Sequence, residues 1–150
     1  MDLTDVKIRI KEHEGFCLEP YNLEYKTSDG TIVKEDFQTG GYGHVIQKGE
    51  EIPTTREGWD KVFEEDFAKA VKNCSKLLNT GAVHPVAFGI VVEMIYQIGH
   101  AGVAKFKKTL SLINQGDYKG ASEEMLDSKW ARQTPSRAQS LSTLMSSIIE

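Results

Sequence analysis

The chain of 150 residues contains few cysteines, histidines and prolines: two, four and four, respectively. Cys17 and Cys74 stand in apolar surroundings, and neither CxxC nor HxxxH spacing occurs, so the sequence predicts no metal site. Reduced core thiols are the expected state of both cysteines, and one disulfide bridge remains the alternative. The GxGxxG and GxxxxGK[ST] spacings are also missing, which argues against a phosphate-binding loop.

Positive charge is scarce as well, with 18 Lys and Arg against 22 Asp and Glu and a formal net charge of -4. No basic stripe alternates with aromatic residues, so nucleic acid is not an expected partner. The N-terminus, with Asp2, Asp5 and Lys7, lacks the apolar segment of a secretory signal. The apolar run 86–96 is predicted to be a buried central helix, too short and interrupted to span a membrane. An apolar content of 39% is ordinary for one globular unit.

The most informative residue is Glu14, at the end of an amphipathic segment. Thr4 is expected to cap a first helix whose apolar residues recur at helical spacing, and Gly15 to end it. A carboxylate in the last turn faces the partly negative end of the helix dipole, which favours its protonated form. A carboxyl group that keeps its proton can act as a general acid, although an isolated surface glutamate needs no such role.

A glycine-rich strand follows a predicted hairpin. Residues 21–37 read as two strands around the turn Ser28-Asp29-Gly30, and the second strand continues into Thr39-Gly40-Gly41-Tyr42-Gly43-His44. Three glycines in four positions weaken a strand, so they predict a bulge or the close approach of a ligand to the backbone. His44 is expected to be a structural, hydrogen-bonded histidine.

The remainder reads as helical. A capping box at Thr54-x-x-Glu57 predicts a helix that ends near residues 79–81. His84-Pro85 begins the buried helix, which the glycines at 99 and 102 are expected to break, and short helices are predicted over 109–115 and 117–126. Thr134-Pro135 gives an N-cap and a proline at the first position of the last helix.

These segments resemble the bacteriophage lysozyme family, specifically the T-even phage muramidase type. Three separated motifs carry the resemblance in the family's order: residues 14–44, residues 94–106, and Ser128-Lys129-Trp130 through Arg137-Ala138. The resemblance implies an α+β fold in one lysozyme-like domain over 1–150, with a hairpin lobe of about 14–53. A helical lobe of about 54–150, joined by the first helix, would complete it.

The resemblance also implies hydrolysis of the β-1,4 bond between N-acetylmuramic acid and N-acetylglucosamine in peptidoglycan, without metal or cofactor. Glu14 matches the general acid, and Thr39 matches the threonine that positions the attacking water. Tyr42, Gln97 and Arg137 match substrate-binding positions. A monomer made in a host cytoplasm without a signal peptide, acting on periplasmic peptidoglycan, is expected. The net negative charge gives no help in binding this anionic polymer, so the affinity has to come from the cleft.

The resemblance further pairs His44 with Asp66, an ion pair that is expected to raise the pKa of His44. Trp130 and Met94 are expected to lie in the core.

One departure from the family affects the chemistry. The second catalytic carboxylate is expected two residues after Tyr21, where this chain has Leu23. If Tyr21 pairs with Thr39, antiparallel register places Glu24 opposite Asp36, and both are candidates for the missing base. Three functions therefore remain: a muramidase, a single-acid lytic transglycosylase, and a wall-binding or structural module that has lost the base.

Overall fold

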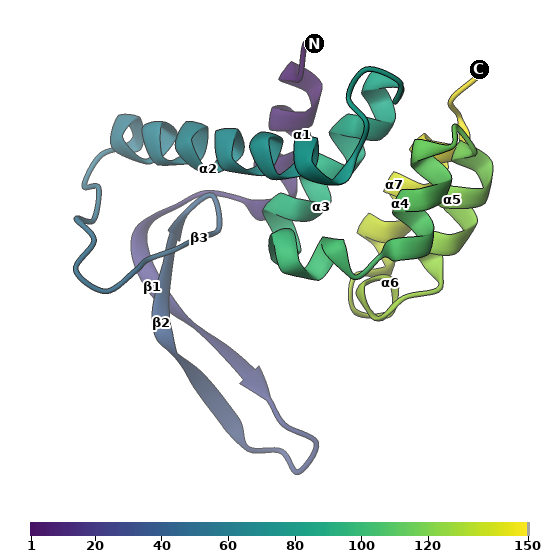
Figure 1. The fold of residues 1–150 in the computed structure, drawn as a ribbon. Helices are drawn as coiled ribbons and strands as arrows, with labels where there is room; N and C mark the ends of the chain where they lie inside the picture. The colour runs from purple at the N-terminus through teal and green to yellow at the C-terminus, as the bar shows by residue number, and fades with distance from the viewer. Residues whose placement is uncertain (150) are drawn as a thin grey trace. The chain divides into compact units, whose positions relative to one another are not determined.

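The computed structural model describes residues 1–149 and, at Tyr25, the backbone only. The fold is α+β, as predicted: a three-stranded antiparallel sheet near the N-terminus precedes a mostly helical remainder (Figure 1). Among the described residues the elements are α1 (Thr4–Glu14), β1 (Cys17–Lys26), β2 (Ile32–Gly41), β3 (His44–Val45), α2 (Arg56–Leu77), α3 (Pro85–Ala104), α4 (Lys107–Asn114), α5 (Tyr118–Leu126), α6 (Lys129–Gln133) and α7 (Pro135–Ser146). The two-residue β3 and the one-turn α6 were not predicted.

The chain divides into two compact units. One unit comprises residues 7–68 and contains the sheet; the other comprises residues 1–6 and 69–150, and its regular elements among the described residues are all helices. Each unit has buried aromatic or aliphatic side chains of its own. Trp59, Phe63 and Phe67 are buried in the unit 7–68, and the helical unit buries residues 87–95 of α3 together with α5 and α7.

The predicted hairpin is present but longer, and its register differs from the expectation. Tyr21 does pair with Thr39, whereas Glu24 pairs with Lys34 and not with Asp36. The reason is a bulge in β2, where the three residues 35–37 stand opposite Leu23 alone. The side-chain amide of Asn22 donates to the backbone carbonyls of residues 35 and 37, at 2.9 and 3.3 Å, and so satisfies acceptors that the bulge removes from the ladder.

Two of the strand glycines make room for a tryptophan and not for a ligand. A Cβ atom on Gly40 would lie 2.6 Å from the ring of Trp59, and one on Gly41 would lie 2.5 Å from it. The indole nitrogen of Trp59 donates to the carbonyl of Leu18 at 2.9 Å, which joins α2 to β1 as well. The glycines therefore let the large ring of Trp59 pack directly on the sheet backbone, where it is 1% exposed.

Two predicted helix caps were misplaced by one or two residues, and a third occupies the predicted position without a capping hydrogen bond. Asp2, and not Thr4, accepts from the first turn of α1, at 2.9 Å from the Thr4 backbone nitrogen. Thr55, and not Thr54, accepts from the backbone of Gly58 and caps α2. Thr134 is the N-cap residue of α7 and Pro135 follows it, as predicted, but the Thr134 hydroxyl donates to the carbonyl of Trp130 and makes no capping hydrogen bond. In the first two cases a neighbouring carboxylate or hydroxyl accepts instead, and sequence alone does not rank the candidates.

Helix α3 forms the centre of the helical unit. His84 caps it by accepting from the backbone nitrogen of Val86, and Pro85 occupies its first turn. Gly99 interrupts the helix with a positive φ of 84°, as predicted, whereas Gly102 lies within its last turn. By length and composition alone, α3 could cross a membrane, contrary to the expectation from sequence. Its residues 87–95 are buried within the helical unit, and a buried core helix meets the same criteria of length and composition.

The expected core residues of the helical unit are buried: Met94 is 2% exposed and Trp130 is 5% exposed. Cys17 and Cys74 are both free thiols, and burial raises the pKa of the Cys74 thiol to about 12. Cys74 therefore stays protonated and unreactive at neutral pH.

Candidate active site

Glu14 lies at the end of α1 and against the glycine-rich turn after β2. Gly15 ends the helix with a φ of 69°, and its backbone nitrogen donates to the carbonyl of Lys11 at 3.0 Å. A Cβ atom on Gly43 would lie 2.7 Å from a carboxylate oxygen of Glu14. Gly43 thus has a different role from Gly40 and Gly41, because it makes space for the Glu14 carboxylate.

Thr39 precedes this turn in β2 and is 3% exposed. It pairs with Tyr21 on one side and with Val45 of β3 on the other. Within the described part of the chain its buried hydroxyl has no hydrogen-bond partner. A buried hydroxyl without a partner costs about 1–3 kcal/mol, so its retention suits a group that holds a water or a substrate atom.

His44 follows in β3 and lies between two carboxylates. Its Nδ1 is 2.6 Å from an oxygen of Asp66 in α2, and its Nε2 is 2.8 Å from an oxygen of Glu50. The hydrogen bond to Asp66 raises the pKa of His44, the interaction with Glu50 adds to the effect, and partial burial opposes it. The other oxygen of Glu50 accepts from the backbone of Gln47 at 2.8 Å, so the loop after β3 is fixed by the same carboxylate. The partner Asp66 was predicted; Glu50 was missed, because a loop residue six positions away gives no periodic signal.

Two further predicted site residues lie in the helical unit. The side-chain oxygen of Gln97 in α3 accepts from the indole nitrogen of Trp130 at 2.8 Å. Arg137 in α7 has its Nε at 3.4 Å from a carboxylate oxygen of Glu93, whose side chain is fully buried. Glu93 was also missed, since it stands inside an apolar run that reads simply as core.

Comparison with known proteins shows the family to which the chain belongs. The model of the phage lysozyme family matches residues 11–145. The chain belongs to the phage lysozyme family. It is 25% identical to the probable T4-type lysozymes 1 and 2 of Dictyostelium discoideum, over 91% of this chain and 90% of each relative. It is 29% identical to the pre-baseplate central spike protein Gp5 of Enterobacteria phage T4, over 69% of this chain and 23% of that protein.

Membership of the phage lysozyme family suggests peptidoglycan hydrolase activity, and hence a glycoside hydrolase with peptidoglycan as its substrate. Among residues 1–149 no group of three His, Cys, Asp or Glu side chains is placed to hold a metal ion.

The position at which the resemblance predicts a second carboxylate is occupied by Leu23. Side chains alternate along a strand, so Leu23 shares a face with Tyr21 and Thr39, while Glu24 lies on the face of Asn22. Leu23 is 44% exposed. Asp36 is exposed within the bulge of β2, where strand alternation is interrupted. The register thus argues against Glu24 as the base and does not assign the role to Asp36.

Tyr42 is more deeply buried than a substrate-binding residue needs to be, with 6% of its surface exposed. Its ring centroid lies 5.1 Å from that of Phe16 and 5.4 Å from that of Phe63. The ammonium group of Lys11 lies 4.8 Å from the centre of the Tyr42 ring, and Arg56 approaches its hydroxyl at 3.3 Å. These contacts give Tyr42 a packing role between α1 and α2, and its predicted substrate contact stays a prediction.

Replacing Gly43 by alanine is expected to lower turnover by about 100-fold. The new methyl group would displace the Glu14 carboxylate, and misplacing a catalytic group by about 1 Å costs on the order of a hundredfold. Gly49→Ala is the matched control: Gly49 has a φ of 81°, close to the 77° of Gly43, but no atom within 4 Å of the added Cβ. Peptidoglycan digestion rates and urea unfolding of both variants make the test. Equal loss of activity in the two variants would show that backbone strain alone is responsible.

The two carboxylates at His44 predict a pH dependence of stability. Because its folded-state pKa is raised above the ordinary value of 6.5, protonated His44 contributes its full stabilisation below that value. The contribution is lost as the pH rises through the folded-state pKa. We expect the free energy of unfolding to fall over this interval in the native protein and to change less in Asp66→Asn. NMR titration of the His44 ring checks the premise, and a pKa at or below 6.5 would contradict it.

Proposed function

We propose that the protein is a muramidase that hydrolyses the β-1,4 bond between N-acetylmuramic acid and N-acetylglucosamine. The observation that carries this proposal is the Glu14 carboxylate against the backbone of Gly43, four residues beyond the unsatisfied hydroxyl of Thr39. Glu14 donates its proton to the leaving glycosidic oxygen as the bond to the anomeric carbon breaks. The Thr39 hydroxyl holds the water that supplies the new oxygen at that carbon, and a carboxylate of the hairpin, Glu24 or Asp36, takes the proton that this water loses.

A second candidate is a lytic transglycosylase, and Leu23 favours it. In that reaction the 6-hydroxyl oxygen of N-acetylmuramic acid attacks its own anomeric carbon while Glu14 protonates the leaving oxygen. The hydroxyl proton then returns to the Glu14 carboxylate, so a single acid suffices. Position 23 carries no carboxylate, and Glu24 lies on the other face of the strand. A reaction that needs only one acid fits this arrangement.

Product analysis tests both reactions in one experiment. Purified peptidoglycan is digested to completion, and the released muropeptides are separated and weighed by mass spectrometry. A muramidase gives reducing ends, whereas a transglycosylase gives anhydro ends that are lighter by one water. Reducing products support the first proposal, and anhydro products replace it by the second. No product with wild-type protein at any concentration leaves the wall-binding module as the function.

We further propose that the protein acts as a monomer on periplasmic peptidoglycan after synthesis in a host cytoplasm, either in host lysis or in wall penetration. The similarity to a phage spike protein supports the second role, and the similarity to the two Dictyostelium lysozymes is neutral between them. Clearing of outer-membrane-permeabilised Gram-negative cells measures the activity directly. Clearing of intact cells only when the protein is expressed inside them would favour host lysis.

A further inference from the structure

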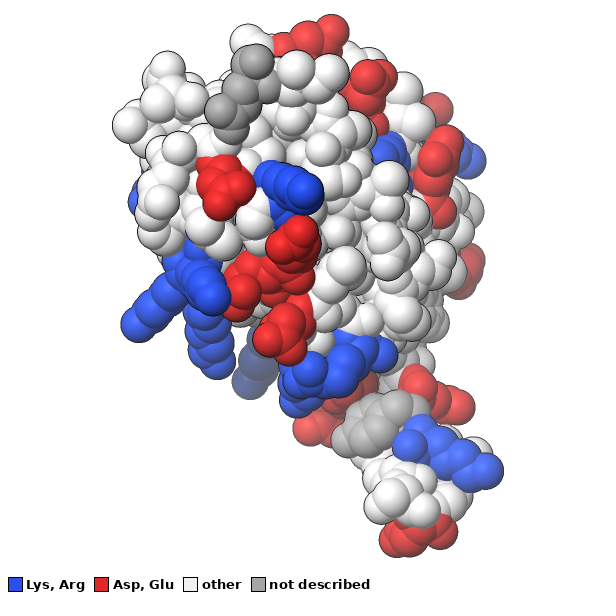
Figure 2. Space-filling view, turned by 90° about the vertical axis from the view of Figure 1, so that its right-hand side faces the viewer, with Lys and Arg blue, Asp and Glu red and all other residues white. Residues whose placement is uncertain are grey.

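The helical unit contains a cavity whose charged lining residues are mostly lysines, although the net charge of the chain is negative. Its volume is about 480 Å3, and it is lined by the end of α3, the start of α4, the end of α5, and α6. Six of its lining residues carry charge: Lys105, Lys107, Lys108 and Lys129, against Glu124 and Asp127. The balance is positive in a protein whose net charge is -4. On the face of the molecule that Figure 2 shows, Lys and Arg side chains gather in groups, and so do Asp and Glu side chains.

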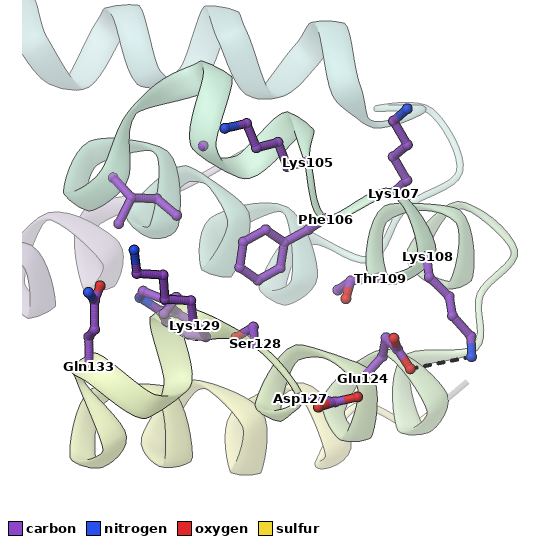
Figure 3. Close-up of a pocket in the computed structure, with 13 residues that line it drawn as sticks. Lys105, Phe106, Lys107, Lys108, Thr109, Glu124, Asp127, Ser128, Lys129 and Gln133 are labelled. Carbon is purple, nitrogen blue, oxygen red and sulfur yellow. Dashed lines mark ion pairs between the residues drawn. The ribbon is translucent and has the colours of Figure 1, made fainter.

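The four lysines are not equivalent. Lys108 forms an ion pair with Glu124 at 3.5 Å, so its charge is already matched. In Figure 3 the side chain of Lys107 extends away from the cavity, whereas Lys105 and Lys129 extend on the same side of the Phe106 ring, with Gln133 next to them. Lys105, Lys129 and Gln133 therefore all line the same cavity as the Phe106 ring.

The wall that carries these groups is well supported. The rings of Phe106 and Trp130 meet edge to face with centroids 6.1 Å apart. The indole nitrogen of Trp130 in turn donates to Gln97. Phe106 also precedes the first residue of α4 and provides no side-chain cap, so the positive end of that helix adds to the potential in the cavity. Lys105 and Lys129 are exposed, and they extend from this packed surface.

We propose that this cavity, the lysine pocket, binds an oxyanion group of the cell-wall polymer. Lys105 and Lys129 bind the anion, and Gln133 donates to it; ammonium groups bind carboxylate and phosphate oxygens alike. The pocket supplies the attraction for an anionic polymer that the net charge of the chain lacks. The identity of the polymer rests on the proposed function, whereas the binding of an oxyanion rests on the pocket itself.

The experiment measures binding without cleavage. In a Glu14→Gln background, the protein is sedimented with purified cell walls at increasing salt concentration. Adding Lys105→Ala and Lys129→Ala is expected to weaken binding by roughly fivefold at low salt, since two exposed ion pairs contribute on the order of 1 kcal/mol in total. The difference should shrink as salt screens the charges. The control adds Lys72→Ala and Lys119→Ala, which remove the same charge from exposed positions outside the pocket.

Two wall preparations identify the source of the oxyanion. Walls freed of phosphate polymers test the phosphate, and walls with amidated peptide carboxylates test the carboxylate. The lysine-dependent part of binding should disappear in one of the two preparations. Equal binding by the pocket and control variants at low salt overturns the proposal, even if the wild-type protein cleaves the wall. Lysine-dependent binding by a protein that cleaves nothing would instead reject the proposed hydrolase and keep the pocket.

Discussion

Glu14→Gln is expected to lower the rate of glycosidic cleavage by about 100-fold to 10,000-fold, the range that general acid catalysis contributes. The amide keeps the size of the side chain and its position against Gly43 but has no proton to give to the leaving oxygen. The unfolding free energy should change little, because no core side chain is altered. The measurements are release of new ends from purified peptidoglycan and urea unfolding of the same preparation.

Glu12→Gln provides the control for this prediction. Glu12 lies in the same helix, is exposed, and loses the same charge on substitution. It should retain nearly full activity. Near-full activity of Glu14→Gln, with Glu12→Gln also active, would remove Glu14 from the mechanism and with it both enzymatic proposals.

Leu23→Asp is expected to increase hydrolysis by about 100-fold or more, the lower end of what a positioned base contributes. The strand register places residue 23 on the face of Thr39, and the exposed position tolerates a charge without burying it. A carboxylate there can accept the proton of the attacking water. If the wild-type protein gives anhydro ends, this variant should also shift the products toward reducing ends, which mass spectrometry detects.

Two substitutions in the hairpin complete the test of the base. Glu24→Gln should have a mild effect, because Glu24 faces away from Thr39 and lies opposite Lys34 in the strand register. Asp36→Asn tests the residue in the bulge. Severe loss in Glu24→Gln would show that the hairpin rearranges on substrate binding and would restore Glu24 as the base; severe loss in Asp36→Asn would assign the base to the bulge.

Most of the fold could be predicted from the sequence because its signals are local. Gly15 and Gly99 act through their own backbone conformations, and the turn around Gly30 fixes the hairpin. The register of the hairpin could not be predicted in the same way. The two extra residues in β2 leave no mark on hydrophobic alternation, and Asn22, whose amide stabilises the bulge, reads as an ordinary strand residue.

The residues of the candidate site also fall into two groups: those that the sequence identifies and those that only the fold shows. Glu14, Thr39 and His44 stand in a recognisable motif, whereas Glu50 and Glu93 are defined only by what the folded chain brings next to them. The three glycines at 40, 41 and 43 look equivalent in the sequence. Only the packing shows that two of them accommodate Trp59 and one accommodates a carboxylate.

The positions of the two tryptophans have a practical consequence for following how the protein unfolds. The chain has two tryptophans, and Trp59 falls in the unit 7–68 while Trp130 falls in the helical unit. Both are buried, so the emission of each should shift to longer wavelength when its own unit opens. Trp130→Phe leaves a fluorophore that reports on the sheet-containing unit alone, and Trp59→Phe leaves one for the helices. Coincident transitions in the two variants would show that the units unfold as one cooperative whole.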